Sequence, residues 1–153
     1  MFVYGKMAAN AIAVMSYLAA SLGRKAGSGE IASVRKLSPT LTAKLLTQLA
    51  AAGLVKGLPG PGGGYSPAKK AKEISFLDIA SVFEQTETPS VCPFGEGWCG
   101  NGEPCPLHNK IQGILRHRER YIQNTRLSVF MKKRGSAPEE LTALQKRSAG
   151  TKK

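Results

Sequence analysis

The chain contains 153 residues, with 22 lysines and arginines against 10 aspartates and glutamates, which gives a formal net charge of +12 at pH 7. A chain of this length buries a core without disulfide bonds, and its three cysteines, confined to one segment, indicate reduced thiols in the cytoplasm and no disulfide framework. The charge favours nucleic acid as a partner over an anionic membrane surface, and no segment reaches the roughly 18 apolar residues of a membrane span.

The first predicted element is an amphipathic helix over residues 7–22. Polar residues at Asn10, Ser16 and Tyr17 interrupt this run, so we interpret it as a core helix and not as a signal peptide. Apolar residues recur in it at spacings of four, three, four and four, which predicts a buried stripe. The stripe consists of Met7, Ala11, Val14, Leu18 and Leu22.

Two short helices are predicted next, separated by a turn at residues 35–37. Ser28 is expected to cap the first of them. Ser38 and Pro39 are a typical N-cap and first helical residue, and Gly53 is a typical residue to follow a helix, so the second helix is bounded at both ends. Its expected buried face consists of Leu41, Leu45, Leu49 and Ala52.

This arrangement predicts a helix-turn-helix, whose second helix enters a DNA major groove. The polar residues expected on its outer face suit contacts with base edges, and the basic residues at the turn suit contacts with phosphates. The alternative is an ordinary helical pair, because any such pair on a protein surface exposes polar residues. The candidate DNA-binding residues in this segment are Arg35, Lys36, Ser38, Thr40, Thr42 and Lys44.

A β-hairpin is predicted directly after the second helix, with one strand at residues 54–56 and a return strand from Tyr65 onward. The connection, residues 59–64, is rich in glycine and proline, as a tight turn requires. A nucleotide-binding loop is disfavoured, because no Gly-Lys-Ser/Thr follows the glycines and no helix begins there. The position is typical of the wing of a winged helix-turn-helix, although a plain hairpin fits as well. Its candidate DNA contacts are Gly62, Gly63 and Tyr65.

The remaining chain contains a short helix, a cysteine loop and a long helix. Ser75 and Asp78 match a capping box for a helix through Phe83, which closes a predicted DNA-binding domain of residues 1–87. A loop at residues 88–108 follows. A long helix is then predicted over about residues 107–123, with the apolar stripe Ile111, Ile114, Leu115 and Ile122.

No segment is left in the chain to cover the long helix, so we expect a homodimer in which residues 109–131 form the dimerisation helix and its following segment. Residues 132–153 are rich in lysine and arginine and are expected to be a mostly disordered basic tail. The expected fold class is therefore mainly α with a small β-hairpin wing, a winged helix-turn-helix plus a long dimerisation helix.

The loop at residues 88–108 carries the candidate metal and cofactor ligands. All three cysteines and one histidine lie within seventeen residues there: Cys92, Cys99, Cys105 and His108. Three thiolates and one imidazole supply the four donors that a tetrahedral zinc ion or an iron-sulfur cluster requires. The glycines and prolines between them permit tight turns. The residues leave zinc, an iron-sulfur cluster and a disulfide-forming thiol switch open.

These motifs together carry a family resemblance. The helix-turn-helix, the wing sequence from Gly60 to Tyr65 and the three-cysteine loop follow one another in the same order as in a known family. From about Met1 to Phe130 the chain resembles the bacterial winged-helix regulators of the IscR and NsrR type. The likeness is greatest to the IscR type, which implies that the three cysteines and His108 hold a 2Fe-2S cluster. Residues 124–127 also resemble the segment after the dimerisation helix in that family.

The chain departs from that family at several positions. Pro59 stands in the wing where relatives often carry an arginine that reaches DNA, and Ala43 stands where the IscR type carries an acidic residue that reads bases, so no target sequence is transferred. Relatives of the NsrR type bind a 4Fe-4S cluster with a carboxylate from the first helix. Residues 1–22 contain no Asp or Glu, which together with His108 favours 2Fe-2S over 4Fe-4S, with zinc less favoured.

The resemblance implies a dimeric transcription factor that binds double-stranded operator DNA under the control of its cluster, as a sensor of iron-sulfur status, redox state or nitric oxide. We expect no enzymatic activity, no small-molecule substrate and no membrane partner. A zinc-stabilised DNA-binding regulator is one alternative. A cluster-bearing redox protein without a DNA role is the other, although a capped recognition helix and a wing argue against it.

Overall fold

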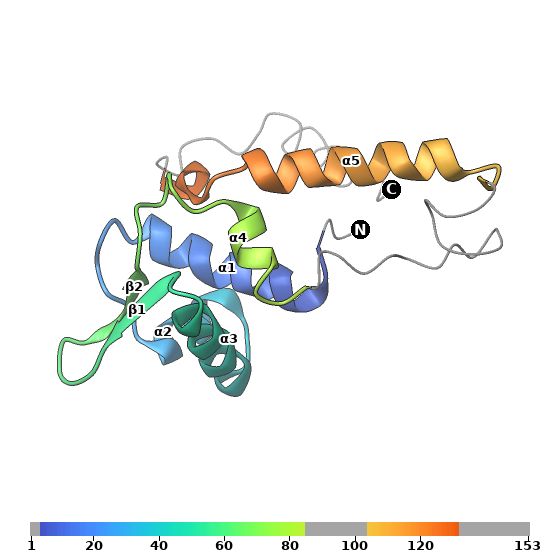
Figure 1. The fold of residues 1–153 in the computed structure, drawn as a ribbon. Helices are drawn as coiled ribbons and strands as arrows, with labels where there is room; N and C mark the ends of the chain where they lie inside the picture. Colours follow the sequence, from blue (N-terminus) through green and yellow to red (C-terminus); the bar gives the residue numbers. More distant parts are fainter. Residues whose placement is uncertain (1–3, 85–103, 132–153) are drawn as a thin grey trace, which may run out of the picture.

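The computed structural model describes residues 4–84 and 104–131, which form a winged helix-turn-helix with a long additional helix (Figure 1). Within these residues the fold is mainly α with a two-stranded antiparallel hairpin, which confirms the expected fold class. The predicted basic tail lies outside the described residues. The elements are α1 (Lys6–Ala20), α2 (Ser28–Arg35), α3 (Pro39–Ala51), β1 (Val55–Leu58), β2 (Gly64–Pro67), α4 (Phe76–Ala80), α5 (His108–Asn124) and a final 3-10 helix, η1 (Leu127–Met131).

Helix α1 lies at the centre of the described fold, with α5 on one side and α2 and α3 on the other (Figure 1). It is buried over more of its circumference than a single stripe requires, because several elements contact it. The stripe does not continue to Leu22 as predicted: α1 ends at Ala20, and Leu22 has a φ of +50° and a 70% exposed side chain. The buried residues of α1 are Ala8, Ala11, Ile12, Val14, Met15, Ser16, Leu18 and Ala19.

Helices α2 and α3 form the predicted helix-turn-helix. Ser28 is the first residue of α2 and not its cap, since Gly27 holds the N-cap position without a side-chain hydrogen bond. Lys36 ends α2 in the left-handed region with a φ of +53°, which turns the chain sharply toward α3. The Ser38 side chain accepts a hydrogen bond from the Leu41 N–H at 3.2 Å, so it is the N-cap of α3 as expected.

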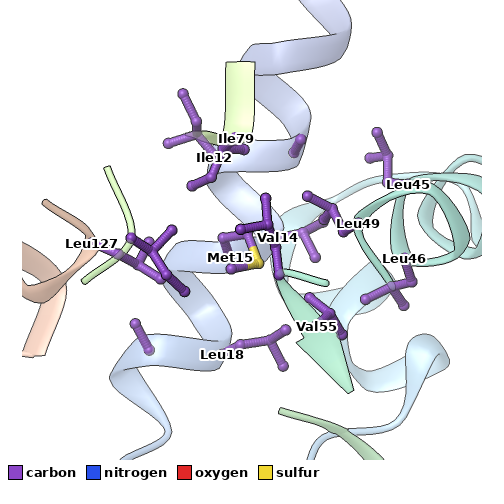
Figure 2. Close-up of a cluster of buried hydrophobic side chains, with 14 of the residues drawn as sticks. Ile12, Val14, Met15, Leu18, Leu45, Leu46, Leu49, Val55, Ile79 and Leu127 are labelled. Carbon is purple, nitrogen blue, oxygen red and sulfur yellow. The ribbon is translucent and has the colours of Figure 1, made fainter. Parts of the chain in front are cut away.

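The hydrophobic core lies where α1, α3, the wing and α4 meet (Figure 2). Each fully buried Leu, Ile or Met stabilises the fold by about 1.5–3 kcal/mol relative to an exposed side chain. The core includes residues from α1 to α4 and also Leu127, which comes after α5 in the sequence. Leu127 thus holds the C-terminal segment to the DNA-binding unit. The side chains that Figure 2 labels are Ile12, Val14, Met15, Leu18, Leu45, Leu46, Leu49, Val55, Ile79 and Leu127.

Strands β1 and β2 pair antiparallel, with Val55 opposite Pro67 and Leu58 opposite Gly64, and form the predicted wing. Its tip requires glycine, because a Cβ on Gly63 would lie 2.2 Å from the carbonyl oxygen of Leu58. The hairpin is attached to the connection between α1 and α2 by two hydrogen bonds between Ala26 and Tyr65, of 3.0 and 2.8 Å. The wing thus has a defined place beside the helix-turn-helix.

Helix α4 begins with the predicted capping box, in which the Ser75 hydroxyl accepts from the Asp78 N–H and the Asp78 carboxylate accepts from the Ser75 N–H. It ends at Ala80, earlier than predicted, and residues 81–83 continue as a turn. The long helix α5 lies within one residue of its predicted range. No helix among the residues at 4–84 and 104–131 is long and apolar enough to cross a membrane.

Candidate nucleic-acid interface and ligand residues

The exposed side of α3 carries the polar residues expected of a recognition helix. Ser38, Thr40, Lys44 and Thr47 are all exposed, and they lie at the N-terminal end and on one side of the helix. Leu45 and Leu49 bury the opposite side against the core. The same helix therefore anchors itself with leucines and presents hydroxyls and an ammonium group to the outside, which suits contacts with base edges and phosphates.

Thr42 is the exception, and its predicted position on the outer face is wrong. Its side chain is fully buried and its hydroxyl donates a hydrogen bond to the Ser38 carbonyl oxygen at 3.0 Å. Thr42 lies three residues before Leu45, so the helical period of 3.6 residues places it on the buried side. The hydroxyl holds the first turn of α3 together instead of facing a ligand.

Arg35 also differs from its expected role as a phosphate contact. Its guanidinium donates a hydrogen bond from Nη2 to the Ser16 hydroxyl at 2.8 Å and lies 5.6 Å from the centre of the Tyr17 ring. Arg35 is thus directed at α1 and fastens the end of α2 to the central helix. Lys36, the next residue, is exposed and remains available to phosphates.

A polar cluster that the sequence did not reveal joins α1 to α2 beside this contact. Glu30 accepts hydrogen bonds from the Tyr17 hydroxyl, at 2.5 Å, and from the Arg24 guanidinium, with which it forms an ion pair. These bonds, that of Arg24 foremost, lower the pKa of Glu30 to about 2, and the bond to Glu30 raises the pKa of Tyr17. Helix α2 buries only Ile31 and Ala32, so this polar cluster helps to set its position.

The three candidate residues of the wing differ in their surroundings. Gly62 is exposed with a φ of +74°, and Gly63 is half-buried under the turn. Tyr65 is half-buried as well, and its ring lies across the hairpin against Gly57, where an added Cβ would come within 3.1 Å of the ring. The backbone of Tyr65 holds the wing to the rest of the fold, whereas the glycine tip leaves the backbone of the wing open to a close approach by a ligand.

Two of the four candidate metal ligands lie in the described part of the chain. Cys105 is buried, and His108, half-buried, is the first residue of α5. The His108 N–H donates a hydrogen bond to the Cys105 carbonyl oxygen at 2.9 Å, so one tight turn brings both residues to the N-terminal end of α5. Cys92 and Cys99 lie outside the described residues. The described residues contain no group of three or more potential metal ligands.

Helix α5 leaves much of its predicted apolar stripe uncovered. Ile122 is buried in the core, whereas the side chains of Ile114 and Leu115 are 63% and 45% exposed. The helix extends along one side of the described fold, opposite α2 and α3 (Figure 1). Apolar side chains on a long exposed helix are typical of a surface that meets a partner.

A recognition helix, a glycine-tipped wing and a long additional helix together define a winged-helix DNA-binding transcriptional regulator. Solved structures agree with this fold. CymR, described as the global cysteine regulator of B. subtilis, matches with a TM-score of 0.72 and 23% identity over 88% of this chain and 100% of its own. T. potens IscR matches with a TM-score of 0.64 and 19% identity, over 90% and 94% of the two chains.

The chain belongs to the Rrf2 family, whose model is described as an iron-dependent transcriptional regulator and matches residues 5–133. A provisionally described HTH-type transcriptional regulator of Aquifex aeolicus is 28% identical over 117 residues, or 75% of this chain and 81% of its own. IscR of Escherichia coli is 30% identical over 99 residues, 63% of this chain and 60% of its own. The fold and these relatives are those of transcriptional regulators and not of enzymes.

Proposed function

We propose that this DNA-binding regulator acts as a homodimer whose affinity for operator DNA is set by an iron-sulfur cluster, held by Cys92, Cys99, Cys105 and His108. Residues 1–87 bind the operator, residues 88–108 carry the ligands, and residues 109–131 join two copies. The signal is iron-sulfur status, redox state or nitric oxide. A 2Fe-2S cluster fits this donor set better than a 4Fe-4S cluster, and zinc is the third option.

The observation that carries the proposal is the position of Cys105 and His108. The imidazole of His108 is on the first residue of the helix that also bears the uncovered apolar residues, and the buried Cys105 thiol lies three residues before it. Thiolates are soft ligands that suit iron, and the burial of Cys105 would limit the access of water to its sulfur when a cluster is bound. The described donors therefore fit such a group, and the family model is described as iron-dependent.

Each residue has a separate role in this proposal. The thiolates bind iron strongly, while His108 contributes a neutral donor that can be protonated, so its bond is the weakest of the four. When bound, the cluster supplies a redox-sensitive and iron-sensitive cross-link within residues 88–108. A tight turn joins Cys105 to His108, the first residue of α5, so binding or loss of the cluster would act directly on the N-terminal end of that helix.

Dimerisation through α5 explains why Ile114 and Leu115 are uncovered in a single chain. A dimer related by a two-fold axis pairs the same surface on both copies. The two recognition helices then meet two operator half-sites about one helical turn apart or a multiple of it. In this arrangement Thr40 and Lys44 contact base edges and phosphates, Lys36 contacts phosphates, and the tip at Gly62 and Gly63 approaches the backbone of the DNA.

The test is to purify the protein anaerobically, record its visible absorption spectrum and count iron, sulfide and zinc per chain. We expect absorbance from an iron-sulfur cluster and equal amounts of iron and sulfide. His108→Ala should weaken cluster retention and leave DNA binding by the cluster-free protein largely intact. His117→Ala is the matched control, since His117 is an exposed histidine on the same helix. A colourless protein with one zinc per chain would refute the cluster and support a zinc-stabilised regulator.

A further inference from the structure

The N-terminus of the central helix α1 lacks a cap of its own. Gly5 is the N-cap residue and makes no side-chain hydrogen bond, and the first turn of α1 contains no acidic residue. A helix N-terminus has unpaired N–H groups and a partial positive charge, and it is stabilised by a nearby carboxylate. In this fold the carboxylate comes from Glu84, 79 residues further along the chain, whose Oε1 accepts a hydrogen bond from the Gly5 N–H.

The other oxygen of the same carboxylate binds α5. Arg118 Nη2 donates to Glu84 Oε2 at 2.6 Å, and the two side chains are 33% and 20% exposed. A partly buried ion pair of this kind is better defined than a pair on the open surface, where solvent weakens the interaction. Glu84 therefore holds the start of α1 and the middle of α5 at the same time, one with each oxygen.

A second contact reinforces this connection. Tyr4, next to Gly5, stacks on Tyr121 with ring centroids 6.5 Å apart, and their hydroxyls are 3.4 Å apart. Tyr121 follows Arg118 by three residues, so both face the start of α1 from the same side of α5. We refer to Tyr4, Gly5, Glu84, Arg118 and Tyr121 as the α1–α5 joint.

The α1–α5 joint lies between two differently held parts of α5. Beyond it, Ile122 is buried in the core, and the Phe76 N–H donates to the Thr125 carbonyl oxygen at 2.9 Å. Before it, Ile114 and Leu115 are exposed. The C-terminal end of α5 is thus fixed to the DNA-binding unit by the core, and the direction in which the rest of the helix extends depends on the joint.

We propose that Glu84 is a positioning residue that sets the direction of α5 relative to the recognition helix, and thereby the operator half-site spacing that the regulator accepts. The inference rests on the proposed homodimer through α5. A change in the angle between α5 and the DNA-binding unit moves the two recognition helices of a dimer relative to each other. Each added base pair rotates one half-site by about 34° and shifts it by about 3.4 Å, so a small change of angle selects a different spacing.

The experiment compares spacing preference among variants of the full chain. An operator is first selected from random DNA with the wild-type protein, and its half-sites are then moved apart or together by one and two base pairs. Binding is measured for each DNA with wild type, Glu84→Gln and Arg118→Gln. The matched control is Glu73→Gln, which removes an exposed carboxylate that lies outside α5 and outside the α1–α5 joint.

We expect Glu84→Gln to reduce the preference for the selected spacing over its one-base-pair neighbours about fivefold or more, which is the lower end of ordinary coupling between sites. Arg118→Gln should do the same, and Glu73→Gln should keep the spacing preference of wild type. Circular dichroism and thermal unfolding establish that each variant is folded, and Arg118→Gln carries the test if Glu84→Gln does not fold.

The possible outcomes separate this inference from the proposed function. An equal loss of affinity at every spacing would make Glu84 a stabilising residue only and would overturn the inference. A dimeric variant with an unchanged spacing preference would overturn it as well. If the wild-type protein is monomeric on its operator, the proposed dimer fails and the inference fails with it.

Discussion

The uncovered residues of α5 permit a quantitative test of the dimer. Replacing Ile114 and Leu115 together by alanine removes apolar surface that is 63% and 45% exposed in the single chain. If a partner covers what remains exposed, each protomer buries about one further apolar side chain at these two positions, and the two-fold axis doubles it. At about 1.5–3 kcal/mol for each side chain, the dimer loses about 3–6 kcal/mol.

That loss corresponds to a dimer dissociation constant weakened by about two to four powers of ten, since each 1.4 kcal/mol is about tenfold. Sedimentation equilibrium over a range of concentrations measures this constant directly. The folding of the single chain should be affected less than by the loss of a fully buried side chain, because about half of the removed surface is already exposed. Ile122→Ala is the contrasting variant: its side chain is buried, so it should lower the free energy of unfolding by about 2–5 kcal/mol.

A double variant that dimerises as tightly as wild type would refute the assignment of α5 as the interface. A double variant that unfolds at a much lower temperature would also contradict the reasoning, because it would mean that Ile114 and Leu115 support the fold of the single chain. The contrast between the exposed pair and Ile122 on the same helix makes the two effects separable.

Three further predictions concern the DNA-binding unit. Lys44→Ala should weaken operator binding and reduce the dependence of log K on log salt by about 0.9 per protomer, or about 1.8 for the proposed dimer, because each protomer loses one phosphate contact; an unchanged slope would place recognition elsewhere. Thr42→Val should lower the free energy of unfolding by about 1 kcal/mol, because the hydrogen bond from Thr42 to Ser38 is lost. The operator affinity of the folded variant should equal that of wild type, and a lower affinity would mean that Thr42 contacts DNA. The pKa of Glu30 is lowered from 4.5 to about 2, so its contribution to stability is present above about pH 5 and is lost as the pH falls toward 2. Unfolding of Glu30→Gln in denaturant should therefore depend less on pH in that range than that of wild type, and equal dependence would refute a role for its bonds with Arg24.

Local patterns predicted most elements of this fold. The Ser38-Pro39 pair marked the start of α3, the Ser75 and Asp78 pair marked the start of α4, and the glycine run marked the wing, because each signal acts within four residues of its own position. The errors also have local causes. Leu22 matches the apolar period of α1, but a helix cannot continue past the left-handed residue there. Ser28 has a capping side chain, yet the chain enters α2 one residue earlier, at Gly27.

The candidate site was predicted less completely than the fold. Thr40 and Lys44 are exposed as expected, but Thr42 lies on the buried side and Arg35 is directed at α1, since polar residue type alone does not state which side of a helix a residue occupies. Residue type and spacing predicted Cys105 and His108 as ligands, and the fold places the two residues one turn apart at the start of α5, while their ligand role stays a prediction. The partners of Glu84 are 79 and 34 residues away, and no local pattern signals such contacts.

The sequence by itself determined the elements, the helix-turn-helix with its wing and the set of candidate ligands, because caps, glycine turns and donor residues are properties of short segments. Only the tertiary structure decided which polar groups face outward, which are used to fasten α2 to α1, and how α5 is held. Those outcomes depend on contacts between segments that come together only after folding. A carboxylate such as Glu84 has the same chemistry everywhere, and its role follows from the two elements between which the fold places it.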